Sequence, residues 1–206
     1  MRVKRMRHRA MMAMAATGIL TALAPATAVQ AAPGDDAKSL DELNMSVMDV
    51  GINSATGDRV VQAAFNELNS DHRFEWGSNC NFYSNYFYGR CQAWCADFVK
   101  YVWKNAGVYA WEHLDSEAGT AARYGKFFGT WHPGTTAGIY PGAAVTYDES
   151  GDPLVNSEHV GVFVGWENGA PKVISGNFNN STRGGVYKHN LHYSTTDRFV
   201  GWTGVG

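Results

Sequence analysis

The chain has 206 residues and a formal net charge of −2 at pH 7. Its first 31 residues hold five of the 17 Lys and Arg residues and none of the 19 acidic ones, so the remaining 175 residues carry a formal charge of −7. A chain of this length is expected to form one domain with a sizeable core. Without clustered Lys and Arg, it is not expected to bind nucleic acid or an anionic membrane surface.

The N-terminus has the pattern of a secretory signal peptide. A basic segment over residues 1–9 precedes an apolar run over 10–24, and small residues follow up to a cleavage pattern near Ala31. The run is too short for a transmembrane helix, which is the alternative, and no later segment is apolar enough to span a bilayer. We therefore expect a secreted protein, extracellular or associated with the cell wall. It is divided into a signal peptide, an N-terminal extension and a folded domain, at residues 1–31, 32–57 and 58–206.

Helical patterns mark the first half of the chain. A capping box at Ser39-Leu-Asp-Glu42 predicts a short helix that ends near Asp49. An apolar stripe predicts a second helix over residues 58–69, with its apolar face against the core, and a further helix is expected over about 116–128. The aromatic segment at 76–88 contains glycine and several asparagines. It is predicted to be an ordered loop, either a cleft wall or a lid on the core.

The stretch from Gly89 to Gly107 places a cysteine at the start of an amphipathic helix. The apolar residues after Cys95 recur with helical spacing, and Gly107 is a typical helix stop. These apolar residues are Phe98, Val99, Val102, Trp103 and Ala106. A thiol in the first turn lies near unpaired backbone N–H groups and the positive end of the helix dipole, and both favour the thiolate. Cys95 is therefore a candidate nucleophile; the alternative is a buried cysteine that fills a gap under the helix.

The chain has three cysteines, and an odd number in an oxidising compartment is most simply explained by one disulfide and one free thiol. Cys80 and Cys91 flank the loop rich in aromatic residues, and a disulfide between them would stabilise the fold by roughly 3 kcal/mol on the loop-entropy model. The competing pair, Cys91 with Cys95, would remove the candidate nucleophile. Disulfide geometry across a single helical turn is unfavourable, so we favour the first pairing.

From Pro141 onward the chain is typical of an antiparallel meander. Short β-rich segments are bounded by Gly, Asn, Asp and Ser, whereas residues 129–138 before them are rich in turn residues. Five strands are predicted, at 143–147, 159–166, 172–175, 185–189 and 198–202. Because helices come first and strands follow, we expect an α+β domain with one helical layer packed on a curved antiparallel sheet.

His159 opens the second of these strands. Strand alternation puts the three valines that follow on one face, which we assign to the core, and His159 on the other, where Gly161 leaves the ring uncovered. His159 is therefore a candidate base, although a histidine at the start of a strand is more often an ordinary surface residue. Asn177 follows the next strand, and its amide oxygen is placed to accept from the imidazole and fix its tautomer.

Taken in order, these segments resemble the CHAP domains. These are cysteine- and histidine-dependent amidohydrolases/peptidases, papain-like in fold and related to the NlpC/P60 group. The resemblance extends over roughly residues 58–203. It is carried by Trp-Cys95-Ala-Asp-Phe, Pro141-Gly-Ala-Ala-Val, His159-Val-Gly-Val, Gly-Asn177 and Phe-Val-Gly-Trp202.

The resemblance implies hydrolysis of an amide bond in bacterial peptidoglycan, either between sugar and stem peptide or within the peptide. Carried onto the matching positions, Cys95 is the nucleophile, His159 the general base and then acid, and Asn177 the orienting residue. A thioester on Cys95 would then be hydrolysed by water. The backbone N–H of Cys95 is the candidate oxyanion donor, and no cofactor is expected.

Two positions depart from the family pattern. Ala143 stands where the family often has Asp, and only Asp97 remains of the acidic residues with which some members bind calcium. We therefore predict no metal site and a structural role for Asp97, in which it bonds backbone groups of the helix start. The other histidines are predicted to be ordinary surface or turn residues: His72, His113, His132, His189 and His192.

The sequence leaves rival functions beside a peptidoglycan hydrolase. One is a non-catalytic module on the same fold that binds the cell wall. Another is a cysteine acyltransferase or a protein-directed peptidase, which would use the same residues on a different acceptor.

Overall fold

The computed structural model describes residues 55–148, 157–179, 183–192 and 198–206. The predicted signal peptide and the short helix predicted to end near Asp49 lie outside the described residues. Within these ranges, no helix is long and apolar enough to cross a membrane.

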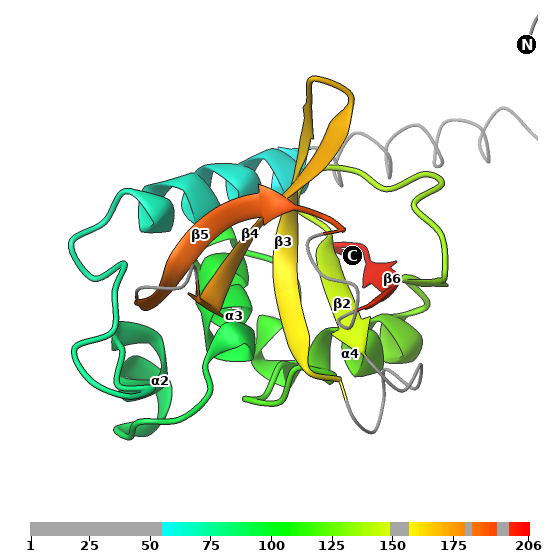
Figure 1. The fold of residues 1–206 in the computed structure, drawn as a ribbon. Coiled ribbons are helices and arrows are strands. Elements are labelled where there is room, and N and C mark those ends of the chain that lie inside the picture. The colour runs from blue at the N-terminus through cyan, green and yellow to red at the C-terminus, as the bar shows by residue number, and fades with distance from the viewer. Residues whose placement is uncertain (1–54, 149–156, 180–182, 193–197) are drawn as a thin grey trace, which may run out of the picture. The chain divides into compact units, whose positions relative to one another are not determined.

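Figure 1 shows an α+β fold in which α3 and α4 lie on one side of an antiparallel sheet. The sheet has six strands in the order β1-β6-β2-β3-β4-β5. Strands β2 to β5 form the expected meander, and β6 returns to pair with β2. The strands are β1 (Trp131–Pro133), β2 (Ala144–Asp148), β3 (His159–Glu167), β4 (Ala170–Asn179), β5 (Gly184–Asn190) and β6 (Arg198–Thr203).

The predicted number of five strands was one too low. The additional strand, β1, lies in the segment that was predicted to form turns, and it pairs with the edge of β6. It is only 3 residues long, so no alternation of apolar and polar residues could mark it in the sequence.

The helical prediction holds for the longer helices. Residues 55–68 are helical, close to the predicted 58–69. The remaining helices are α2 (Phe82–Tyr88), α3 (Cys95–Ala106) and α4 (Thr120–Phe128), and a short 3-10 helix, η1, covers Trp111–His113. Helix α4 begins four residues later than predicted, after Gly119 as its N-cap.

The aromatic segment predicted to be a loop contains α2. The Asn81 side chain caps this helix by accepting from the Ser84 backbone N–H at 2.9 Å, and Gly89 ends it in the left-handed conformation at φ 63°. An asparagine before a helix and a glycine after it are both common capping residues. These two residues were the signal in the sequence.

Helix α3 lies at the centre of the core, as its apolar stripe predicted. All five stripe residues are buried, and Gly107 ends the helix at φ 71°. This face packs with Val160, Val162 and Ile174 from β3 and β4. The opposite face of the sheet carries a second buried cluster, which is made of Ala143, Val145, Tyr147, Phe163, Val173, Leu191 and Trp202.

A disulfide joins Cys80 to Cys91 and leaves Cys95 as the free cysteine, as predicted. The bond ties the residue just before the N-cap of α2 to the residues between α2 and α3. The backbone N–H of Gln92 adds a hydrogen bond to the Asn79 carbonyl, at 3.1 Å. The start of α3 is thus attached to the preceding loop at two neighbouring points.

Replacing both Cys80 and Cys91 by serine is expected to lower the free energy of unfolding by about 3 kcal/mol, because the open loop regains conformational entropy in the unfolded chain. Urea denaturation of wild type and the double variant measures the difference. Thiol titration in denaturant, without reductant, should find one thiol in the wild type. A double variant as stable as the wild type would contradict this role for the disulfide.

Candidate active site

Cys95 is the first residue of α3, and its side chain is only 5% exposed. Its sulfur accepts hydrogen bonds from backbone N–H groups, among them that of Val160 in β3. Val160 directly follows His159 in the chain. The start of the helix with the candidate nucleophile is thus in contact with the start of the strand that carries the candidate base.

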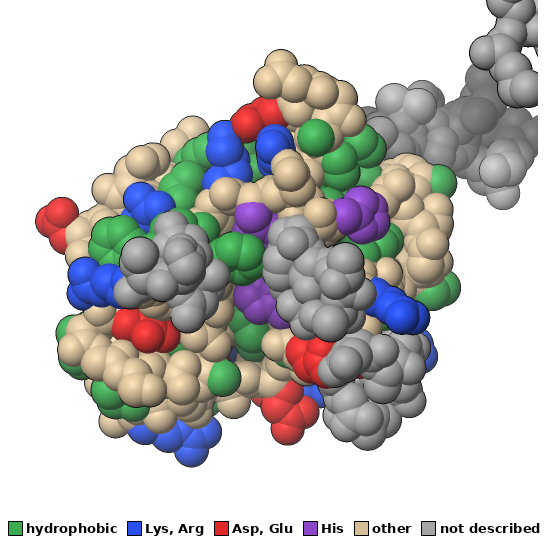
Figure 2. Space-filling model, in the orientation of Figure 1, with side chains coloured by type: hydrophobic (Ala, Val, Ile, Leu, Met, Phe, Trp, Pro, Cys, Tyr) green, Lys and Arg blue, Asp and Glu red, His purple; other side chains and the backbone are tan. Residues whose placement is uncertain are grey.

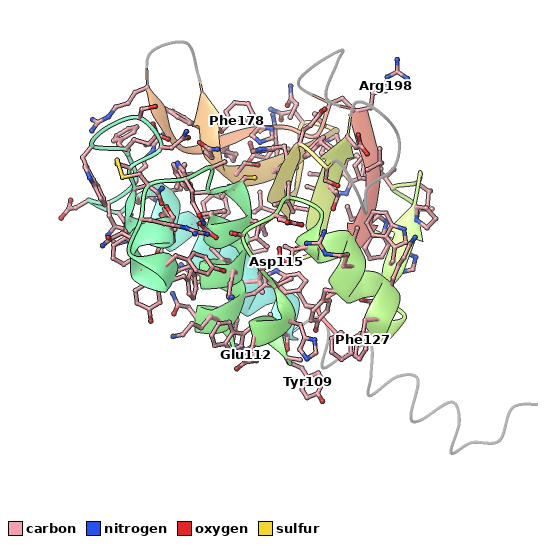
Figure 3. All side chains as sticks on the ribbon, turned by 90° about the horizontal axis from the view of Figure 1, so that it is seen from below. Tyr109, Glu112, Asp115, Phe127, Phe178 and Arg198 are labelled. Atoms are coloured by element: carbon pink, nitrogen blue, oxygen red, sulfur yellow. A yellow bond between two sulfur atoms is a disulfide. The ribbon has the colours of Figure 1, made fainter. Side chains whose placement is uncertain are left out.

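A pocket of about 300 Å³ opens beside the thiol. Its walls come from the start of α3, from the segment that leads into α4, and from the residues just before β3. The lining residues are Ala93, Cys95, Ser116, Glu117, Ala118, Gly119, Arg123, Ser157 and Glu158. Figure 3 labels Asp115 in the segment before α4, where its carboxylate accepts two hydrogen bonds from Arg123, at 2.9 and 2.7 Å. This ion pair fixes one wall of the pocket.

The thiol is not activated in the way that the helix dipole alone suggested. Burial raises the pKa of Cys95 to about 11, and the nearby Asp97 charge raises it further. Hydrogen bonds from the backbone N–H groups of Val160 and Ala96 lower the pKa, but they do not offset the loss of solvation. The prediction of a favoured thiolate was therefore wrong for this state, in which the group is a neutral thiol at pH 7.

The His159 ring lies on the sheet face turned away from α3, as strand alternation predicted. It is not uncovered, however: the residue is only 8% exposed, because Tyr147, Phe178 and His189 surround the ring, with centroids 5.8, 5.9 and 6.4 Å away. The space above Gly161 is filled by the Ser175 side chain. Burial, and then the nearby His189, lower the pKa of His159 to about 3. The imidazole is therefore neutral at pH 7.

His189 was predicted to be an ordinary surface residue, and this prediction was wrong. Its ring stacks on Phe178, with centroids 4.1 Å apart, and its Nδ1 and Nε2 lie 2.8 Å from the Asn190 carbonyl and 2.9 Å from Ser175 Oγ. A carbonyl can only accept, so the network assigns the proton to Nδ1 and leaves Nε2 to accept from Ser175. Burial lowers the pKa of His189 to about 4.

These histidines belong to one face of the sheet. Figure 2 shows histidine side chains grouped near the middle of the face that is turned away from α3. The signal in the sequence was the alternation along β5, which places His189 two residues after Tyr187 on the same face. What the sequence lacked was the pairing that sets β5 beside β4.

Asn177 lies inside β4, which continues to Asn179, and not at the end of a strand. It sits in a bulge between Ser175 and Phe178, with φ 52°, a left-handed conformation that asparagine tolerates better than most residues. Within the described residues, the rings around His159 come from Tyr147, Phe178 and His189. The structure thus brings Cys95 to the start of β3, and it leaves Asn177 on the neighbouring strand.

Asp97, two residues after Cys95, is fully buried. Its Oδ2 accepts from Gln92 Nε2 at 2.9 Å, and its Oδ1 has no hydrogen-bond partner among the described residues. The expectation that it bonds backbone groups of the helix start was therefore wrong. Burial raises the pKa of Asp97 to about 6, while the Gln92 hydrogen bond and the charge of Lys100 lower it.

Replacing Asp97 by asparagine is expected to stabilise the protein at alkaline pH. The folded-state pKa of about 6 lies above the ordinary aspartate value of 3.8, so the protonated form is favoured by folding, and its stabilising effect is lost as the pH rises through 6. Two pKa units correspond to about 3 kcal/mol, an upper bound for the gain in unfolding free energy at pH 8.

Urea denaturation of the two proteins at pH 8 and at pH 4 measures this gain, which should largely vanish at the lower pH. Glu112→Gln, which removes an exposed carboxylate on η1, controls for the loss of one negative charge. An Asp97→Asn variant less stable than the wild type at pH 8 would show that the carboxylate stabilises the fold.

In the part of the chain that the structure describes, no three His, Cys, Asp or Glu side chains are arranged to hold a metal ion. No protein-family model matches the chain, and no curated protein matches it. The site consists of a buried thiol, a neighbouring strand that carries an imidazole, and a pocket between two helix starts.

Proposed function

We propose that the chain is a secreted cysteine hydrolase of the CHAP type, papain-like in fold, that cleaves amide bonds of bacterial peptidoglycan as an amidase or endopeptidase. One observation carries the proposal. The free thiol of Cys95 begins α3, borders a pocket, and accepts a hydrogen bond from the residue that directly follows His159. The candidate nucleophile and the pocket therefore lie at the start of the strand that carries the candidate base, which supports the proposal.

The reaction starts from a neutral thiol and a neutral imidazole. As the sulfur attacks the amide carbonyl carbon, the thiol proton passes to His159, and the carbonyl electron pair becomes an oxyanion. The backbone N–H of Cys95 is the candidate donor to this oxyanion. Collapse of the intermediate breaks the C–N bond, and the imidazolium returns its proton to the leaving amine. Water then attacks the thioester, and a carboxylate leaves as the thiol is restored.

This mechanism requires the imidazole to come within hydrogen-bond distance of the thiol. Catalytic hydrogen bonds often form only when substrate is bound. Burial of the thiol has a use in such a scheme, because a buried neutral thiol resists oxidation and disulfide exchange until substrate fills the pocket. Asn177 is proposed to orient the imidazole from the adjacent strand.

Secretion is supported by two independent features. The N-terminal sequence has the pattern of a signal peptide. The Cys80–Cys91 disulfide is typical of proteins that fold outside the cytosol.

A specific observation favours a second candidate, a non-catalytic module that binds the cell wall. Burial raises the pKa of Cys95 to about 11 and lowers the pKa of His159 to about 3, so both groups are held neutral and proton transfer from the thiol to the imidazole is strongly disfavoured. A module that only binds would tolerate such burial. A hydrolase must relieve it when substrate binds.

Incubation with intact peptidoglycan separates the two candidates. Purified protein and a Cys95→Ala variant are mixed with the polymer, and mass spectrometry identifies the released fragments and their new amino groups. Release by the wild type alone supports the hydrolase and names the bond that is cut. Binding by both proteins without release from either one would overturn the hydrolase proposal in favour of the module.

A further inference from the structure

Trp94 stands directly before the candidate nucleophile and is the N-cap residue of α3. It has no side-chain capping bond, and its carbonyl accepts the first hydrogen bond of the helix, from Phe98 N–H at 3.0 Å. The peptide plane between Trp94 and Cys95 carries the Cys95 N–H, the candidate oxyanion donor. Whatever fixes Trp94 therefore fixes both that donor and the direction of the thiol.

The Trp94 indole is fully buried and held on three sides. One face stacks on the Tyr83 ring, with centroids 5.2 Å apart. Its edge lies against Gly176, where an added Cβ would come within 2.6 Å of Trp94 Cζ3. Its Nε1–H donates to Glu75 Oε1 at 2.7 Å. A buried indole N–H that loses its acceptor pays the full cost of desolvation, so the carboxylate selects one orientation of the ring.

Glu75 is itself fixed by the start of β5. Its backbone N–H donates to the Gly184 carbonyl at 3.2 Å, and its carbonyl accepts from Arg183 Nε at 2.9 Å and from Arg183 Nη2. Its carboxylate occupies the place that a Gly184 side chain would take, 2.5 Å from where a Cβ would lie. Glu75 thus joins the hairpin of β4 and β5 to Trp94, the N-cap residue of α3.

We propose that Glu75 is a positioning residue for Cys95: its carboxylate holds the Trp94 indole, and the indole sets the backbone from which the thiol and its N–H project. The role rests on the proposed function of Cys95 as nucleophile. Glu75 does not touch substrate in this scheme. It acts through Trp94 alone, and an amide oxygen in the same place can replace the carboxylate as acceptor.

The test uses two readouts, of which only one depends on hydrolysis. The first is the rate at which iodoacetamide alkylates Cys95 at pH 8, followed by intact mass, since Cys95 is the only free cysteine. The second is kcat and KM on soluble peptidoglycan fragments. Glu75→Leu removes the acceptor, Glu75→Gln keeps it, and Gly184→Ala displaces the carboxylate without changing it.

In Glu75→Leu and Gly184→Ala, the loosened first turn should expose the thiol. Alkylation is expected to rise about tenfold, as a fall of one unit in the thiol pKa would give. The kcat should fall roughly 10- to 100-fold through misplacement of the nucleophile, with little change in KM. Glu75→Gln should behave as the wild type. Glu167→Leu, which removes an exposed carboxylate bonded to Lys188, is the matched control and should change neither readout.

Folding of each variant is checked by circular dichroism, and Gly184→Ala decides the matter if Glu75→Leu does not fold. Wild-type alkylation and kcat in a folded Gly184→Ala or Glu75→Leu variant would overturn the positioning role. Loss in Glu75→Gln equal to that in Glu75→Leu would overturn the hydrogen-bond explanation. If the wild type cleaves no peptidoglycan, the proposed function fails by itself, and the alkylation rates still decide whether Glu75 positions Cys95.

Discussion

Replacing Cys95 by alanine is expected to lower the rate of peptidoglycan hydrolysis by at least about 10³-fold, because no other group can form the thioester. The two remaining cysteines are joined in a disulfide and supply no nucleophile. The residual rate would come from binding and from the oxyanion donor alone. Release of soluble fragments per unit time, at saturating substrate, measures the effect.

Two controls separate a loss of the nucleophile from a loss of folding. Cys95 is buried, so the thermal midpoint of the alanine variant must be compared with that of the wild type. Ser78→Ala changes an exposed serine that does not line the pocket, and it should keep nearly full activity. Activity that persists in a folded Cys95→Ala variant would place the nucleophile elsewhere.

The second large effect is expected for His159. His159→Gln should lower kcat by about 10²- to 10⁴-fold, the usual contribution of a general base, with a smaller change in KM. Glutamine has a similar length but cannot take up the thiol proton. His113→Gln, a histidine on η1 that stacks on Phe127, is the matched control and should leave kcat unchanged.

The pH profile gives this prediction a second readout. Because the folded-state pKa of His159 is lowered to about 3, the base is deprotonated throughout the neutral range, and protonation removes it only in strong acid. Any acid limb of kcat/KM that belongs to His159 should therefore lie far below the ordinary histidine value of 6.5. An acid limb at 6.5 that disappears in His159→Gln would contradict the buried, neutral base.

The long periodic elements could be predicted because local sequence determines them. The apolar stripe of α3 and its glycine stop predicted both the helix and its buried face. The alternation in β3 placed the valines against α3 and His159 on the other side of the sheet. Cysteine parity and the unfavourable geometry of a Cys91–Cys95 bond favoured the disulfide that is observed.

The features that were missed depend on contacts between distant segments. Strand β1 has too few residues to show the apolar–polar alternation of a strand, and it forms by pairing with the edge of β6. His189 lies beside Ser175 because β5 pairs with β4. The protonation states of Cys95 and His159 follow from burial on the two sides of β3, whereas the sequence offered only the helix dipole as a guide.

The central claim is that Cys95 forms a covalent acyl intermediate, and an acid-quench experiment tests it most directly. The protein is mixed with soluble peptidoglycan fragments, quenched in acid within milliseconds, digested and mapped by mass spectrometry. We predict an acyl group on the peptide that contains Cys95, attached as a thioester that hydroxylamine removes, and absent from Cys95→Ala. Hydrolysis that proceeds at full rate without any such adduct, in the wild type and in the alanine variant alike, would contradict the account.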